Sequence, residues 1–197
     1  FLEELAALEA QGMKGLIVDL RNNPGGVVQA VQQIAEALVP EGGTIMHLEY
    51  RDGRREKTVS ASGGKPYPIV ALINEGSASA SEILAAAIRE SAGGRLVGQR
   101  TFGKGLVQST IRLSDGSGVK LTIAKWLTPD GKTIHETGIA PDIFAARPKL
   151  FDAVAIPKNR VLMYDMTGDE VKNVQLILEG LGFPPGRTDG YFRRDTE

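Results

Sequence analysis

Two short segments of the sequence carry residue types that can perform hydrolytic chemistry. The first is residues 74–83 (NEGSASASEI), which contains Ser79, and the second is residues 103–108 (GKGLVQ), which contains Lys104 and Gln108. A serine hydroxyl is a weak nucleophile until a base removes its proton. Because no histidine or cysteine lies close to either segment, the lysine is the only plausible base. The pattern therefore predicts a Ser-Lys hydrolase if the chain is an enzyme.

Ser79 follows an apolar run, residues 69–73 (IVALI), and precedes an alanine-rich helical segment. Ser79 and Glu82 fit the S-x-x-E capping box, and on this segment alone a capping role is commoner than a nucleophilic one. The two roles are compatible, because a helix N-terminus offers free backbone N–H groups and partial positive charge. Such donors stabilise the oxyanion that forms when a serine attacks a carbonyl. Ala80 supplies the N–H next to the candidate nucleophile.

Lys104 lies between two glycines, and the commoner state of one lysine in a glycine-rich loop is solvent-exposed. Burial against apolar walls favours the neutral form of a lysine instead, provided that no carboxylate lies close. Gln108 follows four residues later, on the same face in a helix or in a strand, so its amide can orient the lysine. The alternative role of Gln108 is that of a polar residue on the wet face of a strand.

Two glycine-rich segments offer further chemistry. Residues 98–104 (GQRTFGK) match most of a nucleotide-binding loop, but that motif needs Ser or Thr next and then a helix, so nucleotide binding is disfavoured. Residues 23–26 (NPGG) allow close backbone approach, and either glycine can present an N–H to an oxyanion. The alternative, which the residues favour equally, is a plain strand-to-helix turn. We expect Asp19 and Arg21 to pin this turn rather than to catalyse.

The composition sets limits on the class of protein. The 197 residues are 42% hydrophobic and 24% charged, an ordinary globular mixture, and the net charge of −1 gives no sign of nucleic-acid binding. There is no cysteine, and the two histidines, His47 and His135, lie far apart, so neither is expected to bind a metal. The chain begins at Phe1 inside a helical pattern and shows no signal peptide or membrane helix, which suggests a fragment.

Hydrophobic periodicity and turn signals predict the secondary structure. Helices are expected at residues 1–11, 27–38, 81–91 and 169–181. Strands are expected at residues 15–20, 44–50, 56–60, 69–73, 96–98, 106–113 and 119–126, the first and fourth of them buried. Strands that alternate with helices predict an α/β layered core.

Five segments occur together in an order and spacing that resemble a known family: residues 19–26 (DLRNNPGG), 76–82 (GSASASE), 103–108 (GKGLVQ), 128–131 (TPDG) and 138–142 (GIAPD). They resemble the carboxy-terminal processing proteases, also called tail-specific proteases, of peptidase family S41, over roughly residues 1–145. The resemblance implies an α/β fold with a ClpP/crotonase-like β/α core and a β-hairpin-rich region. It also implies a serine endopeptidase that cleaves proteins near their C-termini and needs no metal or cofactor.

By the same resemblance, Ser79 is the nucleophile, Lys104 is the general base and Gln108 is its orienting partner. The oxyanion hole is formed by the backbone N–H after the serine and one from the glycine pair, the second glycine being favoured: Ala80, Gly26 and Gly25. The flanking serines, Ser77 and Ser81, are structural neighbours.

The resemblance also predicts the domains and partners. Residues 1–160 are expected to form the protease core, and residues 161–197 a truncated helical module similar to peptidoglycan-binding domains, through 171–181 and 186–192 (GRTDGYF). The family's PDZ domain is expected before Phe1 and is absent from this sequence. Expected partners are the C-terminal regions of protein substrates, a second copy in a homodimer and the cell wall, but no nucleic acid. The expected location is extracytoplasmic, in the bacterial envelope, periplasm or spore intermembrane space.

Two other classes of function compete with the protease. A catalytically resting or non-catalytic binding or scaffolding module could hold these residues misaligned in the absence of the PDZ domain. An acyl-CoA enzyme of the crotonase type shares a similar core and oxyanion device. That chemistry usually needs a carboxylate in the pocket, whereas the motifs here supply Ser79 and Lys104.

Overall fold

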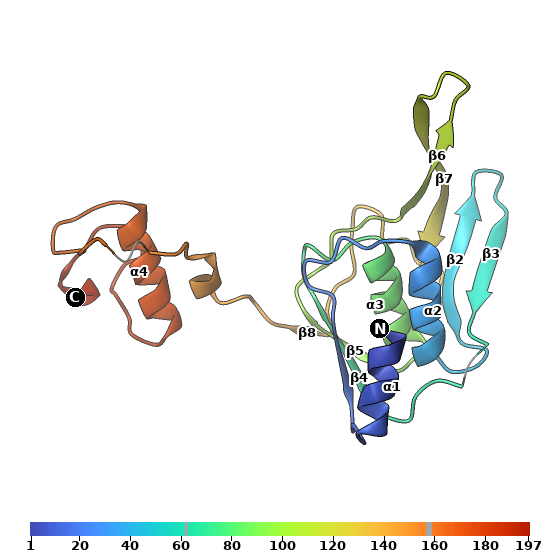
Figure 1. Cartoon of the computed structure of the whole chain (residues 1–197), viewed down its shortest axis with the longest axis horizontal. Helices are drawn as coiled ribbons and strands as arrows, with labels where there is room; N and C mark the ends of the chain where they lie inside the picture. The colour runs from blue at the N-terminus through green and yellow to red at the C-terminus, as the bar shows by residue number, and fades with distance from the viewer. Residues whose placement is uncertain (62, 157–158) are drawn as a thin grey trace. The chain divides into compact units, whose positions relative to one another are not determined.

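The structure, a computed structural model, describes residues 1–61, 63–156 and 159–197. They form two compact units, Phe1–Ala145 and Ala146–Glu197 (Figure 1). The sequence had placed the boundary after residue 160, whereas the two units of the structure meet after residue 145. The reason is that the short helix η1 (Lys149–Asp152) packs against helix α4 (Asp169–Gly180) of the second unit. Gly180 lies so close to Leu150 that a Cβ there would collide with it.

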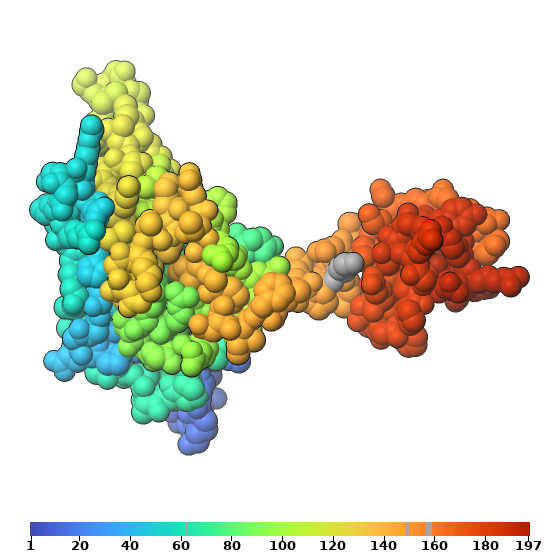
Figure 2. Space-filling model, turned by 180° about the vertical axis from the view of Figure 1, so that it is seen from behind, coloured from blue at the N-terminus to red at the C-terminus, as the bar shows by residue number. Residues whose placement is uncertain are grey.

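The first unit contains two four-stranded sheets, which confirms the predicted α/β class. One sheet is parallel, in the order β1 (Leu16–Asp19), β4 (Ile69–Ile73), β5 (Arg95–Gly98) and β8 (Ile143–Phe144). The other is antiparallel, in the order β3 (Arg55–Val59), β2 (Thr44–Tyr50), β7 (Gly118–Leu127) and β6 (Leu106–Arg112). The hairpin of β6 and β7 projects beyond the rest of this unit (Figure 2).

Helix α3 (Ala80–Glu90) joins the two sheets into one core (Figure 1). It contacts β4 and β5 of the parallel sheet and β2 of the antiparallel sheet, and it also packs against α2 (Val28–Leu38). Nine consecutive residues of α3 are buried, from Ala80 to Ile88, because the helix has protein on nearly every side. Its alanines are small enough to let both sheets approach closely. The remaining helix of this unit is α1 (Leu2–Ala10).

The expected helices and strands are present, with ends that differ by at most one residue. The exception in environment is β1, which was expected to be a buried strand. It lies at the edge of its sheet with β4 as its neighbour, and the side chain of Ile17 is 69% exposed. The two-residue strand β8 was not predicted, because so short a segment has no periodicity to detect.

The second unit is organised around one buried polar side chain. Gln175 of α4 is fully buried, and its amide nitrogen donates to Tyr191 O (2.8 Å) and Thr196 Oγ1 (3.1 Å). Its amide oxygen accepts the N–H of Gly190 at 2.8 Å. These bonds hold the segment after α4 against the helix. The similarity of this unit to peptidoglycan-binding domains stays a prediction.

Neither unit shows a feature of a membrane span or a metal centre in the part of the chain that the structure describes. None of the described helices is long and apolar enough to cross a bilayer. No group of three or more His, Asp or Glu side chains among the described residues is arranged to hold a metal ion.

Candidate active site

The candidate residues meet at the carboxyl ends of three neighbouring parallel strands. β1 leads into the glycine turn at 23–26, β4 leads into the serine segment at 74–79, and β5 leads into the lysine loop at 99–105. Loops at this edge of a parallel sheet commonly form ligand-binding crevices. The fold therefore brings together segments that are far apart in the sequence.

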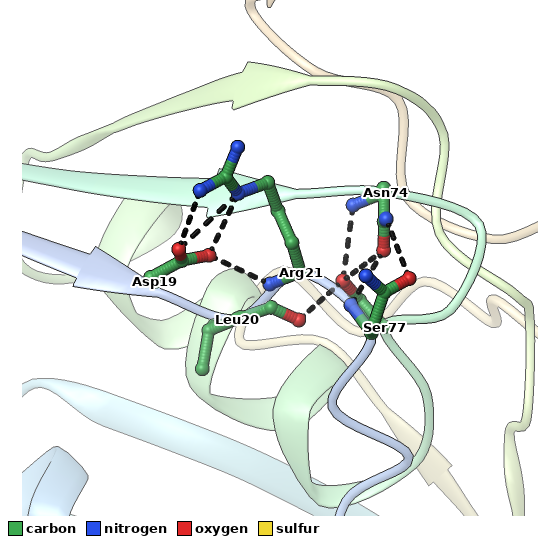
Figure 3. A network of polar contacts seen from close by, with 6 residues as sticks. Asp19, Leu20, Arg21, Asn74 and Ser77 are labelled. Atoms are coloured by element: carbon green, nitrogen blue, oxygen red, sulfur yellow. Dashed lines mark hydrogen bonds and ion pairs between the residues drawn. The ribbon is translucent and has the colours of Figure 1, made fainter. Parts of the chain in front are cut away.

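A network of polar contacts fixes the first two turns to each other (Figure 3). Arg21 donates from Nε and Nη2 to the Asp19 carboxylate at 2.9 and 2.7 Å, which lowers the pKa of Asp19. The buried Ser77 Oγ donates to Leu20 O at 2.7 Å. The N–H of Asn22 donates to Asn74 Oδ1 at 2.8 Å. Asp19 and Arg21 bind each other beside this turn, and their predicted role in pinning it stays a prediction.

Ser79 adopts a strained backbone conformation at the start of α3, with φ of 57° and ψ of −117°. A residue other than glycine at positive φ is uncommon, and such strain, of roughly 1–3 kcal/mol, clusters at functional sites. Two hydrogen bonds hold the turn: the Ala78 N–H donates to Asn23 O (3.0 Å) and the Ser79 N–H donates to Glu82 Oε2 (2.8 Å). The predicted interaction between Ser79 and Glu82 therefore exists beside any catalytic role.

The glycine turn packs directly against the backbone that follows Ser79. Gly25 has a φ of +90°, and a Cβ there would lie 2.6 Å from Ala78 O and 2.7 Å from Ala80 N. Its own N–H donates to Asn23 Oδ1 at 3.0 Å. Gly26 has open space around it, and no hydrogen bond among the described residues uses its N–H. Of the two glycines, Gly26 is therefore the better candidate for an oxyanion donor.

Glu82 links the serine turn to the lysine loop. Its side chain is fully buried, and its two carboxylate oxygens accept four hydrogen bonds. Oε2 accepts the N–H of Ser79 (2.8 Å) and of Lys104 (2.9 Å). Oε1 accepts Thr101 Oγ1–H (2.6 Å) and the N–H of Gly103 (2.7 Å). A single carboxylate oxygen therefore positions the backbones of both the candidate nucleophile and the candidate base.

The lysine loop is fixed from its other side by Trp126 of β7. The buried Trp126 donates from its indole Nε1 to Lys104 O at 2.9 Å, and its backbone N–H donates to Gly105 O at 3.0 Å. Gly103 has a φ of +93°, and a Cβ there would lie 2.8 Å from Gly138 N. A Cβ at Gly105 would likewise lie 2.9 Å from His135 N, so both flanking glycines are needed for close packing and the backbone of the loop is fixed.

One cavity of about 170 Å³ brings the predicted catalytic side chains together. Ser79, Lys104, Gln108 and Gly26 all line it, and so does Lys120 of β7, which the sequence had not indicated. No Asp or Glu side chain is among these lining residues. Among the described residues, no hydrogen bond joins Ser79 Oγ to Lys104 Nζ. Catalytic hydrogen bonds often form only when substrate is bound, so the missing bond is compatible with a catalytic and with a non-catalytic site.

Gln108 reaches the cavity through an irregularity of the hairpin. Val107 pairs with Ala124, whereas Gln108 pairs with Thr122, so that β7 has one extra residue at this point. Such bulges re-aim side chains and are frequent beside active sites. The predicted hydrogen bond between Gln108 and Lys104 is not among those of the described residues. Gln108 is therefore placed at the cavity, and its orienting role stays a prediction.

A second, larger cavity of about 270 Å³ lies beside the glycine turn. It shares Gly26 with the first cavity and reaches Ala80, but it is otherwise lined mostly by apolar side chains such as Leu20, Val31 and Leu84. The candidate oxyanion donors therefore stand at the border between an apolar cavity and one that carries two lysines.

Three residues that build the site were missed or undervalued in the sequence: Thr101, Trp126 and the clamping role of Glu82. Their partners lie about twenty positions away along the chain, so no local pattern reveals the contacts. A buried carboxylate needs hydrogen-bond donors, and only this requirement could have indicated these contacts. The sequence did not predict that Glu82 is buried.

The family of the chain follows from comparison with known proteins. The model of peptidase family S41 matches residues 1–145, which cover all of the segments that form the site. The chain belongs to peptidase family S41. This confirms the resemblance found in the sequence, and the matched range coincides with the first compact unit.

Individual members of family S41 give the same result. The chain is 41% identical to carboxy-terminal processing protease CtpB of Bacillus subtilis over 99% of its own length and 41% of that protein. It is 48% identical to a carboxyl-terminal-processing protease of Synechocystis over 73% of its length and 34% of that protein. The solved photosystem II D1 C-terminal processing protease superposes with a TM-score of 0.69 at 40% identity, over 75% of this chain and 39% of that one. The chain thus spans well under half the length of these relatives.

Proposed function

We propose that this chain carries the catalytic core of a serine endopeptidase that cleaves protein substrates near their C-termini. The observation that supports the proposal most directly is the single cavity lined by Ser79, Lys104 and Gln108, with no carboxylate in its wall. Membership of family S41 and similarity to proteins named carboxy-terminal processing proteases support the substrate class.

In the proposed reaction, Ser79 Oγ attacks the peptide carbonyl while unprotonated Lys104 Nζ takes the hydroxyl proton. The oxygen of the tetrahedral intermediate accepts hydrogen bonds from the N–H groups of Ala80 and Gly26. The C–N bond then breaks, and Lys104 gives its proton to the leaving amine. Water attacks the remaining ester with Lys104 as base, which releases the new carboxylate and restores Ser79.

A second function, a non-catalytic binding or scaffolding module, stays open because no hydrogen bond joins Ser79 Oγ to Lys104 Nζ among the described residues. An acyl-CoA enzyme is less well supported, because that chemistry uses a carboxylate in the pocket and the lining of this one contains none. A homodimer, cell-wall contact through the second unit and an extracytoplasmic location stay predictions.

Hydrolysis of an unstructured protein such as casein tests the proposal. We expect Ser79→Ala and Lys104→Ala each to lower the rate by at least about 10³-fold, since both groups act in the same bond-making step. Lys125→Ala is the matched control, because Lys125 is an exposed lysine of β7 outside the cavity lining. Cleavage that persists in pure, folded Lys104→Ala would overturn the proposed mechanism. No Ser79-dependent cleavage by the folded chain would favour the binding module.

A further inference from the structure

Lys120 is a second lysine in the wall of the catalytic cavity, and the proposed reaction does not use it. It belongs to β7, on the hairpin that also carries Gln108. Its backbone partner is Thr110, two residues after Gln108, so Lys120, Thr110 and Gln108 share one face of the hairpin. That face is turned to the cavity, since two of its members line it.

The opposite face of the hairpin has a different character. Five exposed apolar side chains alternate with the polar ones: Ile111, Leu113, Val119, Leu121 and Ile123. The hairpin is therefore amphipathic, and the register places Lys120 on its polar side. A one-residue shift would put the lysine on the apolar face, so the register of the hairpin determines the charge of the cavity wall.

The charge of Lys120 is not balanced within the described part of the chain. None of the ion pairs among the described residues involves Lys120 or Lys104. The cavity lining likewise contains two lysines and no carboxylate. Because the proposed reaction uses Lys104 in its neutral form, Lys120 supplies the positive charge of this small cavity, which is complementary to a ligand that carries a negative charge.

The direction of the proposed reaction determines which part of a substrate meets Lys120. Lys104 must hand its proton to the leaving nitrogen, so the residues on the C-terminal side of the scissile bond lie on the Lys104 side of Ser79. The apolar cavity beside Gly26 and Ala80 is left for the acyl side. The negative charge that every substrate carries on its C-terminal side is the α-carboxylate at the end of its chain.

We propose that Lys120 binds the terminal α-carboxylate of a substrate whose scissile bond lies within the last few residues of the chain. This inference rests on the proposed function, and it locates selection for chain ends inside the catalytic cavity. A lysine ammonium suits the role, because it is a compact charge on a flexible stem that can follow tails of slightly different length.

Peptide binding tests the inference separately from catalysis. An N-terminally labelled peptide is prepared with a free C-terminal carboxylate and as the C-terminal amide, and its Kd is measured by fluorescence anisotropy with the Ser79→Ala chain. We expect the free acid to bind about five- to tenfold more tightly than the amide. Adding Lys120→Met should abolish this ratio, whereas adding Lys125→Met should preserve it.

Several outcomes would overturn the inference. They are an equal affinity for acid and amide in the Ser79→Ala parent, a ratio that survives Lys120→Met, and no binding of either peptide by folded samples. Recovery of affinity by an amide peptide ending in Asp would show that the site binds side-chain carboxylates instead. Casein hydrolysis by the unmutated chain separates the two proposals: cleavage without an acid preference defeats only the role of Lys120, and an acid preference without cleavage defeats only the peptidase.

Discussion

Glu82→Gln is the substitution that most directly tests how the site is held together. The carboxylate accepts four hydrogen bonds while fully buried, from Ser79, Lys104, Thr101 and Gly103. Glutamine has nearly the same shape, but one of its two terminal groups is an NH₂, which donates and cannot accept. The amide can therefore satisfy only one of the two donor pairs.

The expected cost follows from these contacts. The less damaging orientation turns the NH₂ toward Thr101, whose hydroxyl can rotate, but the Gly103 N–H cannot and is left without an acceptor. An unsatisfied buried donor costs about 1–3 kcal/mol, and loss of charge from the two retained bonds adds about 1 kcal/mol each. The total of about 3–5 kcal/mol is a large part of a typical unfolding free energy. It corresponds to a fall in Tm of roughly 10 °C.

Activity should fall as well, because Glu82 Oε2 positions the backbones of both Ser79 and Lys104. A displacement of about 1 Å at a catalytic group costs about 10²-fold in rate, so we expect kcat to fall by about that factor with a smaller change in KM. Calorimetry and peptide hydrolysis well below the lowered Tm measure the two effects, with the exposed Glu75→Gln as control. An unchanged Tm would refute the clamp, and a lowered Tm with an unchanged kcat would refute its role in positioning.

Two further predictions concern the glycine turn and the first helix. Gly25→Ala should lower the rate of hydrolysis by at least about 10²-fold, because the new Cβ would lie only 2.7 Å from Ala80 N and would push that backbone away. Gly26→Ala should keep the wild-type Tm, since nothing lies within 4 Å of a Cβ at this position. Wild-type Tm and activity for Gly25→Ala would contradict the close packing of the glycine turn on the serine turn. Hydrogen bonds from Lys65 and Tyr67 lower the pKa of Glu9, so its contribution is present at neutral pH and is lost as the pH falls below about 4.5. Denaturant titrations should therefore show Glu9→Gln less stable than wild type at pH 7, with a difference that shrinks as the pH falls below about 4.5. A difference that widens in acid would reverse the assigned sign.

Much of the fold could be predicted because its signals are local. The apolar run at 69–73 and the alternation in the two hairpins predict strands within a residue or two of β4, β2 and β7. The edge position of β1 could not be predicted in this way, since periodicity reports which side chains are apolar and not which neighbour covers them. Ile17 illustrates the difference: it is apolar, as the pattern requires, and yet it is exposed on this edge strand.

The candidate site was predicted only as far as its motifs extend along the chain. Ser79, Lys104 and Gln108 stand in recognisable segments, and the structure brings all three to one cavity. Glu82 was expected to serve only the turn beside it, because the S-x-x-E pattern describes one local hydrogen bond. Its bonds to the lysine loop depend on the tertiary pairing of β4 with β5, which brings that loop to the start of α3.

The hydrogen bonds that hold the serine turn use backbone groups, whereas the proposed chemistry uses the side-chain hydroxyl of Ser79. The Ala78 N–H to Asn23 O bond and the Ser79 N–H to Glu82 Oε2 bond both use the backbone of the turn. Removing the Ser79 hydroxyl leaves both bonds in place and removes only the capping contact of its side chain with the Glu82 N–H, so Ser79→Ala is expected to fold with a loss of stability of about 1 kcal/mol. Removing the Glu82 carboxylate breaks the support and the chemistry together. A loss of activity therefore identifies a reacting group only when stability is nearly unchanged, and in this site Ser79→Ala comes much closer to that condition than a change of Glu82.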